Sequence, residues 1–324
     1  MSISSSRRMD GVGVVRVPRP APNEVLQIIT NYIGYEYISF LGGGGFGRTY
    51  RVRSPDGFEM ALKVVPLDEP AGATELRSLN IIRNVRHPNL LPIVRTWQIE
   101  GHLAILMELA SGTLSDRYMV HRRSGLAGVP AIEATEYMLD AAKGLDYLNA
   151  NGIQHQDIKP ENLLLVGGCV KVADFGLLHF LQHTLSNFSG GMTIAYAPPE
   201  YFKGRITKWS DQYQLGVTYC YLRGGRVPFV GNVAELINGH INDLPDLTML
   251  HPSERPSVER ALAKVPADRW PNCRTFAEEL RRSLPGDGGD TGPGPVPGGP
   301  RGGMTTQIVD NPDDQRGDGF IRAT

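Results

Sequence analysis

The chain has 324 residues, of which 41% are hydrophobic and 21% are charged, proportions typical of a soluble globular protein with enough apolar material for a sizeable core. Its 33 basic and 34 acidic side chains give a formal net charge of −1. A nucleic-acid-binding protein usually carries a basic surplus, so we expect no nucleic-acid partner.

The cysteines and the N-terminal segment indicate a cytoplasmic protein. Cys169, Cys220 and Cys273 are far apart and form no CxxC pair, so we predict neither a disulfide framework nor a zinc site. A reducing compartment fits this pattern best. Residues 1–10 lack the apolar core of a signal peptide, and no run of about 18 apolar residues predicts a membrane span.

The composition divides the chain into three regions. Residues 1–33 form an N-terminal extension that is rich in Pro and Arg at 16–22 and could form a short helix at 24–32. Residues 34–284 carry the periodic hydrophobic patterns of a folded domain. Residues 285–324 begin with a stretch of Gly and Pro that offers no apolar face, so we predict a disordered tail.

Residues 34–109 favour strands with one helix. Predicted strands cover 37–41, 49–53, 59–65 and 102–108, and the turn signal Pro55-Asp56-Gly57 suits an antiparallel meander. Leu76, Leu79, Ile82 and Val85 recur at helical spacing and predict a helix over 73–85.

Residues 110–284 favour helices. The predicted helices cover 132–149, 211–222, 233–239, 256–263 and 273–284, and a short β pair at 163–166 and 170–172 encloses Gly167-Gly168. The predicted fold class is therefore α+β, with a small antiparallel β-rich lobe (34–109) followed by a larger, mainly helical lobe (110–284).

A glycine-rich run between two predicted strands contains Gly42, Gly44 and Gly47 in the spacing G-x-G-x-x-G. Glycine lets the backbone approach phosphate and present its N–H groups, although a flexible turn would explain the run equally well. A strand on both sides argues against a dinucleotide-binding fold. The absence of Gly-Lys-Ser/Thr argues against a Walker A loop.

Lys63 lies in an apolar strand, sixteen residues after Gly47. Burying a lysine without a partner is costly, so an ATP phosphate together with a carboxylate would explain its position. Glu75 is the only acid in the predicted helix 73–85 and is the best carboxylate by sequence. The alternatives are an outward-facing lysine on an edge strand and a solvated surface glutamate.

The strongest signal is the stretch His155-Gln156-Asp157-Ile158-Lys159-Pro160-Glu161-Asn162, followed twelve residues later by Asp174-Phe175-Gly176. Asp157 can orient an attacking hydroxyl and accept its proton, and Lys159 can balance charge on a transferring phosphoryl group. Asn162 and Asp174 offer the hard oxygen ligands that suit Mg²⁺. The β pair between them would bring these groups together.

These motifs, in this order and spacing, resemble the Hanks-type (eukaryotic-like) serine/threonine protein kinases, over about residues 35–284. The resemblance implies ATP and Mg²⁺ as cofactors and a protein substrate with Ser or Thr hydroxyls. Gly42, Gly44 and Gly47 would cover the ATP phosphates, and Lys63 would hold them and pair with Glu75. Met107 would be the gatekeeper, Glu108 and Ala110 would contact adenine, and Ala61 and Leu164 would enclose it. Asp157 would be the base, and Asn162 and Asp174 the metal ligands.

The resemblance extends through the large lobe. Residues 193–200 (Thr-Ile-Ala-Tyr-Ala-Pro-Pro-Glu) look like the end of an activation segment, and Thr193 with Lys159 is the arrangement of Ser/Thr-type enzymes. Asp211 would anchor the catalytic loop from a central helix. Arg269 would form an ion pair with Glu200.

The sequence departs from the family pattern at three places. Gln156 replaces the usual Arg, which in the family pairs with a phosphate on the activation loop, so activity should not require that phosphorylation. Thr49 replaces a usual Val under the adenine, which could lower ATP affinity modestly. Glu75 lies 12 residues before His87, further than is usual. An ATP-binding pseudokinase scaffold and a small-molecule kinase on the same fold stay as alternatives.

Overall fold

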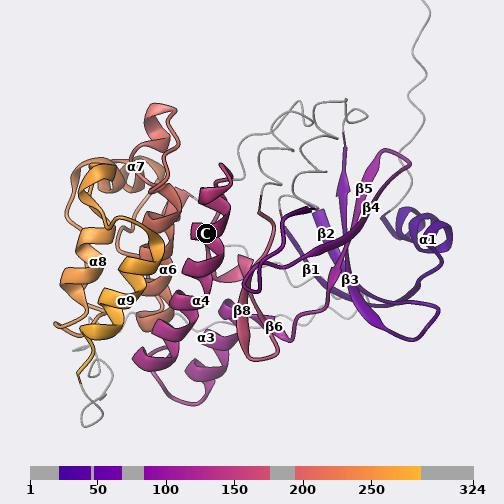
Figure 1. The fold of residues 1–324 in the computed structure, drawn as a ribbon, viewed down its shortest axis with the longest axis horizontal. Coiled ribbons are helices and arrows are strands. Elements are labelled where there is room, and N and C mark those ends of the chain that lie inside the picture. Colours follow the sequence, from indigo (N-terminus) through magenta and orange to yellow (C-terminus); the bar gives the residue numbers. More distant parts are fainter. Residues whose placement is uncertain (1–21, 45–46, 68–83, 176–193, 286–324) are drawn as a thin grey trace, which may run out of the picture. The chain divides into compact units, whose positions relative to one another are not determined.

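The computed structural model describes residues 22–44, 47–67, 84–175 and 194–285. Residues 73–83 of the predicted helix at 73–85, with Glu75, and residues 286–324 of the predicted tail lie outside these ranges. The described residues form a small lobe built on a five-stranded sheet and a larger helical lobe, which confirms the predicted α+β fold (Figure 1). Within these ranges, no helix is both long and apolar enough to cross a bilayer.

The sheet of the small lobe is antiparallel throughout, in the order β1-β2-β3-β5-β4. Its strands are β1 (Glu36–Gly44), β2 (Gly47–Arg53), β3 (Glu59–Pro66), β4 (Ile93–Ile99) and β5 (His102–Glu108). The four predicted strands are confirmed, and their turns follow the glycines of the sequence. Strand β4 was not predicted, because its exposed and buried side chains do not alternate regularly along this edge strand.

The two faces of this sheet are buried in different cores. Successive side chains of a strand point to opposite faces. Ile105 and Met107 on β5 join the large core that continues into the helical lobe, whereas Ala104 and Leu106 join a separate core. Helix α1 (Pro22–Ile33) closes that second core with the buried side chains Val25, Leu26 and Ile29.

Helix α1 was predicted only as a short lead-in to the domain, at 24–32. Its apolar positions 25, 26, 29 and 33 follow helical spacing and give one buried stripe. The segment therefore belongs structurally to the small lobe, and Ile29 is fully buried against the sheet.

The large lobe is organised around helix α6 (Ser210–Gly224), whose side chains are almost all buried. Helices α4 (Ala131–Ala150), α8 (Arg255–Ala261) and α9 (Cys273–Arg282) pack on it. The remaining elements are α3 (Leu114–Arg123), α7 (Val233–Asn242), the strands β6 (Gly112–Thr113), β7 (Leu163–Val166) and β8 (Cys169–Val172), and the short turns η1 (Pro160–Asn162), η2 (Ile194–Tyr196), η3 (Tyr201–Lys203) and η4 (Pro266–Asp268). The predicted helices and the predicted β pair are confirmed.

A buried ion pair fixes the start of α6 to the segment before α9. Arg269 donates to both carboxylate oxygens of Glu200, at 2.8 and 2.7 Å, and also to the carbonyls of Trp209 and Ala263. Ser210 donates to the same carboxylate at 2.9 Å. Burial opposes ionisation of Glu200, but these hydrogen bonds outweigh it and hold the pKa of its carboxyl below its usual value. The expected Glu200–Arg269 pair is thereby confirmed.

Candidate active site

A stripe of polar side chains on α6 holds the loop that carries Asp157. Asp211 accepts the backbone N–H groups of His155 and Gln156, each at 2.9 Å, which confirms its expected anchoring role. Gln214 accepts the N–H of Ile158 at 3.0 Å and donates to the carbonyl of Gln156 at 2.9 Å. Because residues three apart on a helix share a face, Asp211 and Gln214 can both form hydrogen bonds with consecutive peptide groups of the loop.

The loop backbone is held in an unusual conformation at Gln156. Its φ of 69° lies in the left-handed region, which non-glycine residues rarely adopt. Such strain persists only where surrounding contacts enforce it. Here the N–H of Gln156 is bound by Asp211 and its carbonyl by Gln214. Burial raises the pKa of Asp211, whereas the N–H groups that it accepts act in the opposite direction.

Asp157 projects from this loop into a mostly buried position and is 3% exposed. One of its carboxylate oxygens lies 2.8 Å from Lys159 Nζ. Asn162 Nδ2 donates both to the Asp157 carbonyl, at 2.7 Å, and to its carboxylate, at 3.0 Å. These contacts fix the orientation of the carboxylate before any substrate arrives, which is the requirement for a positioned base.

The β7–β8 hairpin brings Asn162 next to Asp174. Leu163 pairs with Val172 at the open end of the hairpin, and the N–H of Ala173 donates to the Asn162 carbonyl at 2.9 Å. His155 Nε2 lies 2.6 Å from the Ala173 carbonyl. Asp174 itself has a φ of 59°, so it is a second site of left-handed backbone in the same place.

Lys63 is 7% exposed, and its Nζ lies 2.5 Å from Asp174 Oδ2. In the sheet it stands opposite Thr49 on one side and Ile105 on the other, so these three side chains share a face. The structure therefore supplies the carboxylate that a buried lysine requires, and that carboxylate is Asp174. The predicted partner Glu75 lies outside the described residues, so its pairing with Lys63 stays a prediction.

The side chains of Asn162 and Asp174 fit a magnesium ion by their donor atoms. Both Asn162 Nδ2 contacts go to Asp157, which leaves Asn162 Oδ1 as its acceptor for a cation. Asp174 adds carboxylate oxygen. Across the described ranges, no group of three or more His, Cys, Asp and Glu side chains could hold a metal alone. Mg²⁺ commonly uses one or two protein oxygens together with substrate phosphates and water, and Asn162 and Asp174 offer oxygens of this kind.

The residues assigned to adenine come from both lobes. Ala61 and Met107 are directly paired across β3 and β5, and both are buried. Leu164 stands opposite Lys171 in the β7–β8 pair, and Lys171 Nζ lies 2.6 Å from Glu108 Oε2 at the end of β5. This ion pair links β8, the strand that pairs with the strand of Leu164, to the end of β5. Ala110 lies half-buried between β5 and β6.

The glycine run covers the end of β1 and the start of β2, and its residues 45–46 lie outside the described ranges. Gly44 pairs with Gly47, and Gly42 pairs with Thr49. Gly47 has a φ of 133°, and a Cβ there would lie 2.3 Å from the Val64 carbonyl oxygen. Only glycine fits at this position, because a side chain would collide with the backbone of β3.

The protein kinase domain family matches residues 35–282. The chain belongs to this family. PknF, a serine/threonine-protein kinase of Mycobacterium tuberculosis, is 31% identical over 80% of this chain and 58% of its own length. PknJ of Mycobacterium bovis is 30% identical over 82% and 48%, and the probable serine/threonine-protein kinase PknB of Lactococcus lactis is 30% identical over 76% and 40%. The kinase domain thus spans about half the length of these curated relatives.

Two side chains of the kinase domain with evident structural roles were not singled out in the sequence. Gln214 holds the loop of Asp157, and Lys171 pairs with Glu108. Gln214 could have been found, because it is a polar residue three positions after Asp211 in a helix whose side chains are almost all buried. No local signal marks Lys171, since its partner lies 63 residues away.

Proposed function

We propose that this kinase domain transfers the γ-phosphate of ATP to serine and threonine hydroxyls of protein substrates. The observation that carries the proposal is the fixed position of the Asp157 carboxylate between Lys159 and Asn162. The second support is the buried ion pair of Lys63 with Asp174, which follows Asn162 across the β7–β8 hairpin.

In the proposed reaction, the substrate hydroxyl oxygen bonds to the γ-phosphorus while the bond from that phosphorus to the β–γ bridging oxygen breaks. ADP leaves with the electron pair of that bond, and the hydroxyl proton passes to Asp157. Lys159 balances charge on the transferring group. Mg²⁺ held by Asn162 and Asp174 would neutralise phosphate charge.

The nucleotide would lie between the lobes. Gly42, Gly44 and Gly47 would cover its phosphates, and Lys63 would bind them. Thr49, Ala61, Met107 and Leu164 would contact the adenine ring, with backbone groups of Glu108 and Ala110 at its edge. The open space around Gly42, where an added Cβ would meet no atom within 4 Å, is compatible with a ligand there.

Activity should be independent of activation-loop phosphorylation, because Gln156 is neutral and cannot bind a phosphate as an arginine does. The hydrogen bond that Asp211 accepts from the Gln156 N–H and the one that Gln214 donates to the Gln156 carbonyl hold the loop conformation instead. Replacing Thr184, Ser186 and Ser189, which lie outside the described residues, with Ala should therefore leave the turnover rate unchanged. A loss of tenfold or more would contradict this part of the proposal.

A cytoplasmic location belongs to the proposal, because ATP and reduced cysteines are both found there.

The decisive experiment incubates the purified protein with Mg²⁺ and γ-labelled ATP, with and without a generic basic protein substrate. Wild type is expected to yield labelled phosphoserine or phosphothreonine, and Asp157→Asn and Lys63→Ala are expected to yield none. The exposed Asp56→Asn and Lys203→Ala serve as matched controls. Label on the Asp157→Asn variant would overturn the assignment of the base. ATP binding without transfer by wild type would favour the pseudokinase alternative, and transfer only to small alcohols would favour a small-molecule kinase.

A further inference from the structure

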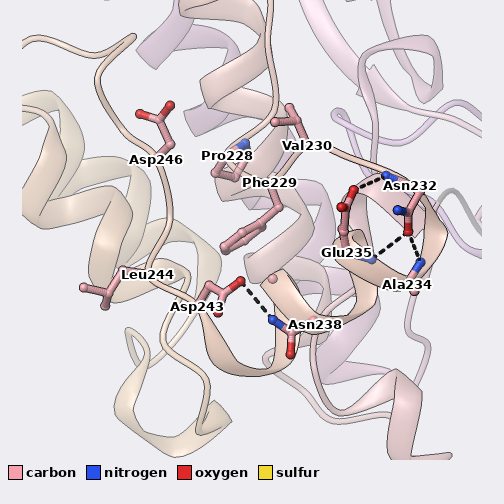
Figure 2. Close-up of a pocket in the computed structure, with 11 residues that line it drawn as sticks. Pro228, Phe229, Val230, Asn232, Ala234, Glu235, Asn238, Asp243, Leu244 and Asp246 are labelled. Atoms are coloured by element: carbon pink, nitrogen blue, oxygen red, sulfur yellow. Dashed lines mark hydrogen bonds between the residues drawn. The ribbon is translucent and has the colours of Figure 1, made fainter.

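A hollow of about 580 Å³ lies on the large lobe, between the segment after α6, helix α7 and the segment after α7. Figure 2 shows the Phe229 ring inside it, between Val230 and Asp243. Phe229 is only 6% exposed and forms the apolar floor, whereas Val230 and Leu244 are 70% and 83% exposed. Such exposed aliphatic side chains beside an apolar floor are typical of an interaction site.

The walls of the hollow are built by specific local contacts. Asn232 caps α7 by accepting the N–H groups of Ala234 and Glu235, and Glu235 accepts the N–H of Asn232 at 2.7 Å (Figure 2). Gly231 has a φ of 132°, and a Cβ there would lie 2.4 Å from Glu235 Oε2. The hollow is therefore held in shape without a ligand.

The rim of the hollow is negative. Residues 228–249 contain Glu235, Asp243 and Asp246 but no Lys or Arg. Asp246 pairs with Arg226, whereas Glu235 and Asp243 have no ion-pair partner within 4 Å among the described residues. His240 adds no compensating charge at neutral pH, because burial lowers the pKa of its imidazole to about 4.

Lys264 is a further cation near the hollow, and its charge interacts with that of Asp243 on the rim. Its Nζ donates to the carbonyls of Gly239 and His240, at 2.7 and 2.9 Å, at the C-terminal end of α7. It also lies 4.3 Å from the centre of the Phe229 ring. Lys264 therefore offsets part of the negative charge of Asp243, whereas Glu235 has no ion-pair partner among the described residues.

The hollow adjoins the substrate side of the site. Helix α7 contacts the turn η2, which includes Tyr196. Tyr196 belongs to the stretch 193–200 that resembles the end of an activation segment. A protein segment bound at α7 would consequently lie beside the end of this stretch.

We propose that this hollow is a docking site for a basic segment of the protein substrate that carries an aliphatic side chain. This inference rests on the proposed function. The aliphatic side chain would pack on Phe229, Val230 and Leu244, and the basic side chains would face Glu235 and Asp243. A second copy of this chain is disfavoured as the occupant, because a two-fold contact through this face would bring the same carboxylates together.

The test is a fluorescence anisotropy titration with a short labelled peptide of Lys, Arg and Leu. Two control peptides replace either every Leu with Ser or every basic residue with Gln, and both are expected to bind at least tenfold more weakly than the first peptide. Leu244→Ser should raise the Kd about tenfold, as expected for loss of one buried leucine contact. The double variant Glu235→Gln, Asp243→Asn should raise it about tenfold as well and flatten its salt dependence.

Matched control variants change the same residue types elsewhere on the large lobe. In the wild type, Leu126 is 44% exposed and Glu259 is exposed on α8. Leu126→Ser and Glu259→Gln should therefore leave the Kd unchanged. Asp157→Asn should also bind the peptide as wild type does. Docking can therefore be judged even if phosphoryl transfer fails, which keeps the two proposals separable.

Further support would come from a phosphorylation assay in which the docking peptide is fused to a Ser-containing acceptor. Leu244→Ser is then expected to raise KM for the fused peptide about tenfold while changing kcat less than twofold. Three results would overturn the proposal: no binding by wild type, equal binding by Leu244→Ser, or equal binding of the three peptides. Self-association in sedimentation that Leu244→Ser abolishes would identify a second copy as the occupant and would also overturn it.

Discussion

The buried Glu200–Arg269 ion pair gives the sharpest prediction about stability. Both side chains are nearly inaccessible, with side-chain exposures of 5% and 0%. Glu200→Gln keeps the shape of the side chain but leaves the Arg269 guanidinium buried without its counter-charge. Removing one partner of a buried pair costs about 3–5 kcal/mol of unfolding free energy.

The magnitude can be compared with an exposed pair of the same chemistry in the same lobe. Arg274 and Glu278 lie one turn apart on α9, with side-chain exposures of 63% and 37%. Because solvent screens such a pair, Glu278→Gln should cost less than about 0.5 kcal/mol. The two substitutions are chemically identical, so the difference between them measures the effect of burial.

The pair should also influence acid stability. The pKa of Glu200 is lowered in the folded protein, since the hydrogen bonds from Arg269 and Ser210 outweigh its burial. A lowered folded pKa gives a contribution to stability that is present above the unfolded pKa and is lost as the pH falls through the folded pKa. Glu200→Gln should therefore flatten the fall in stability below about pH 4.5, the region of the unfolded glutamate pKa.

The assay is urea unfolding followed by circular dichroism, at pH 7 and at a series of lower pH values. Wild type, Glu200→Gln, Arg269→Met and the double variant form a thermodynamic cycle. We expect each single variant to lose about 3–5 kcal/mol, and the double variant to lose clearly less than their sum, because no uncompensated charge stays buried. Equal losses for Glu200→Gln and Glu278→Gln, or full additivity in the cycle, would refute the reasoning.

Three further predictions concern the site and the small lobe. Gly47→Ala should raise KM for ATP and lower the unfolding free energy by about 1–3 kcal/mol, because its Cβ would collide with the Val64 carbonyl; an unchanged KM would contradict the tight turn. Ile29→Ala should cost about 2–5 kcal/mol in urea unfolding, since Ile29 is fully buried under the sheet. Gln214→Ala should lower kcat about tenfold with little change in KM for ATP, because it frees the Gln156 carbonyl; an unchanged kcat would mean that Asp211 alone holds the loop.

Much of the fold could be predicted from local patterns. The strands β1, β2, β3 and β5 follow from apolar runs bounded by glycine turns, and the large-lobe helices follow from the helical spacing of apolar residues. Strand β4 escaped prediction because its buried and exposed side chains do not alternate regularly. The packing of α1 on the sheet was not predicted either. Its amphipathic stripe predicts that one face is buried, but it does not identify the surface against which that face packs.

The sequence by itself determined the identity and order of the chemical groups. The spacing of Asp157, Asn162 and Asp174 around a hairpin predicts their convergence, because a hairpin returns the chain to its starting point. Pairings between distant segments depended on tertiary structure. Lys63 needs an anionic neighbour wherever it is buried, but only the packing of the two lobes places Asp174 within 2.5 Å of it. In the same way, Lys171 forms an ion pair with Glu108, and Gln214 forms a hydrogen bond with the Gln156 carbonyl. Folding brings these residues together, and no local sequence pattern relates them.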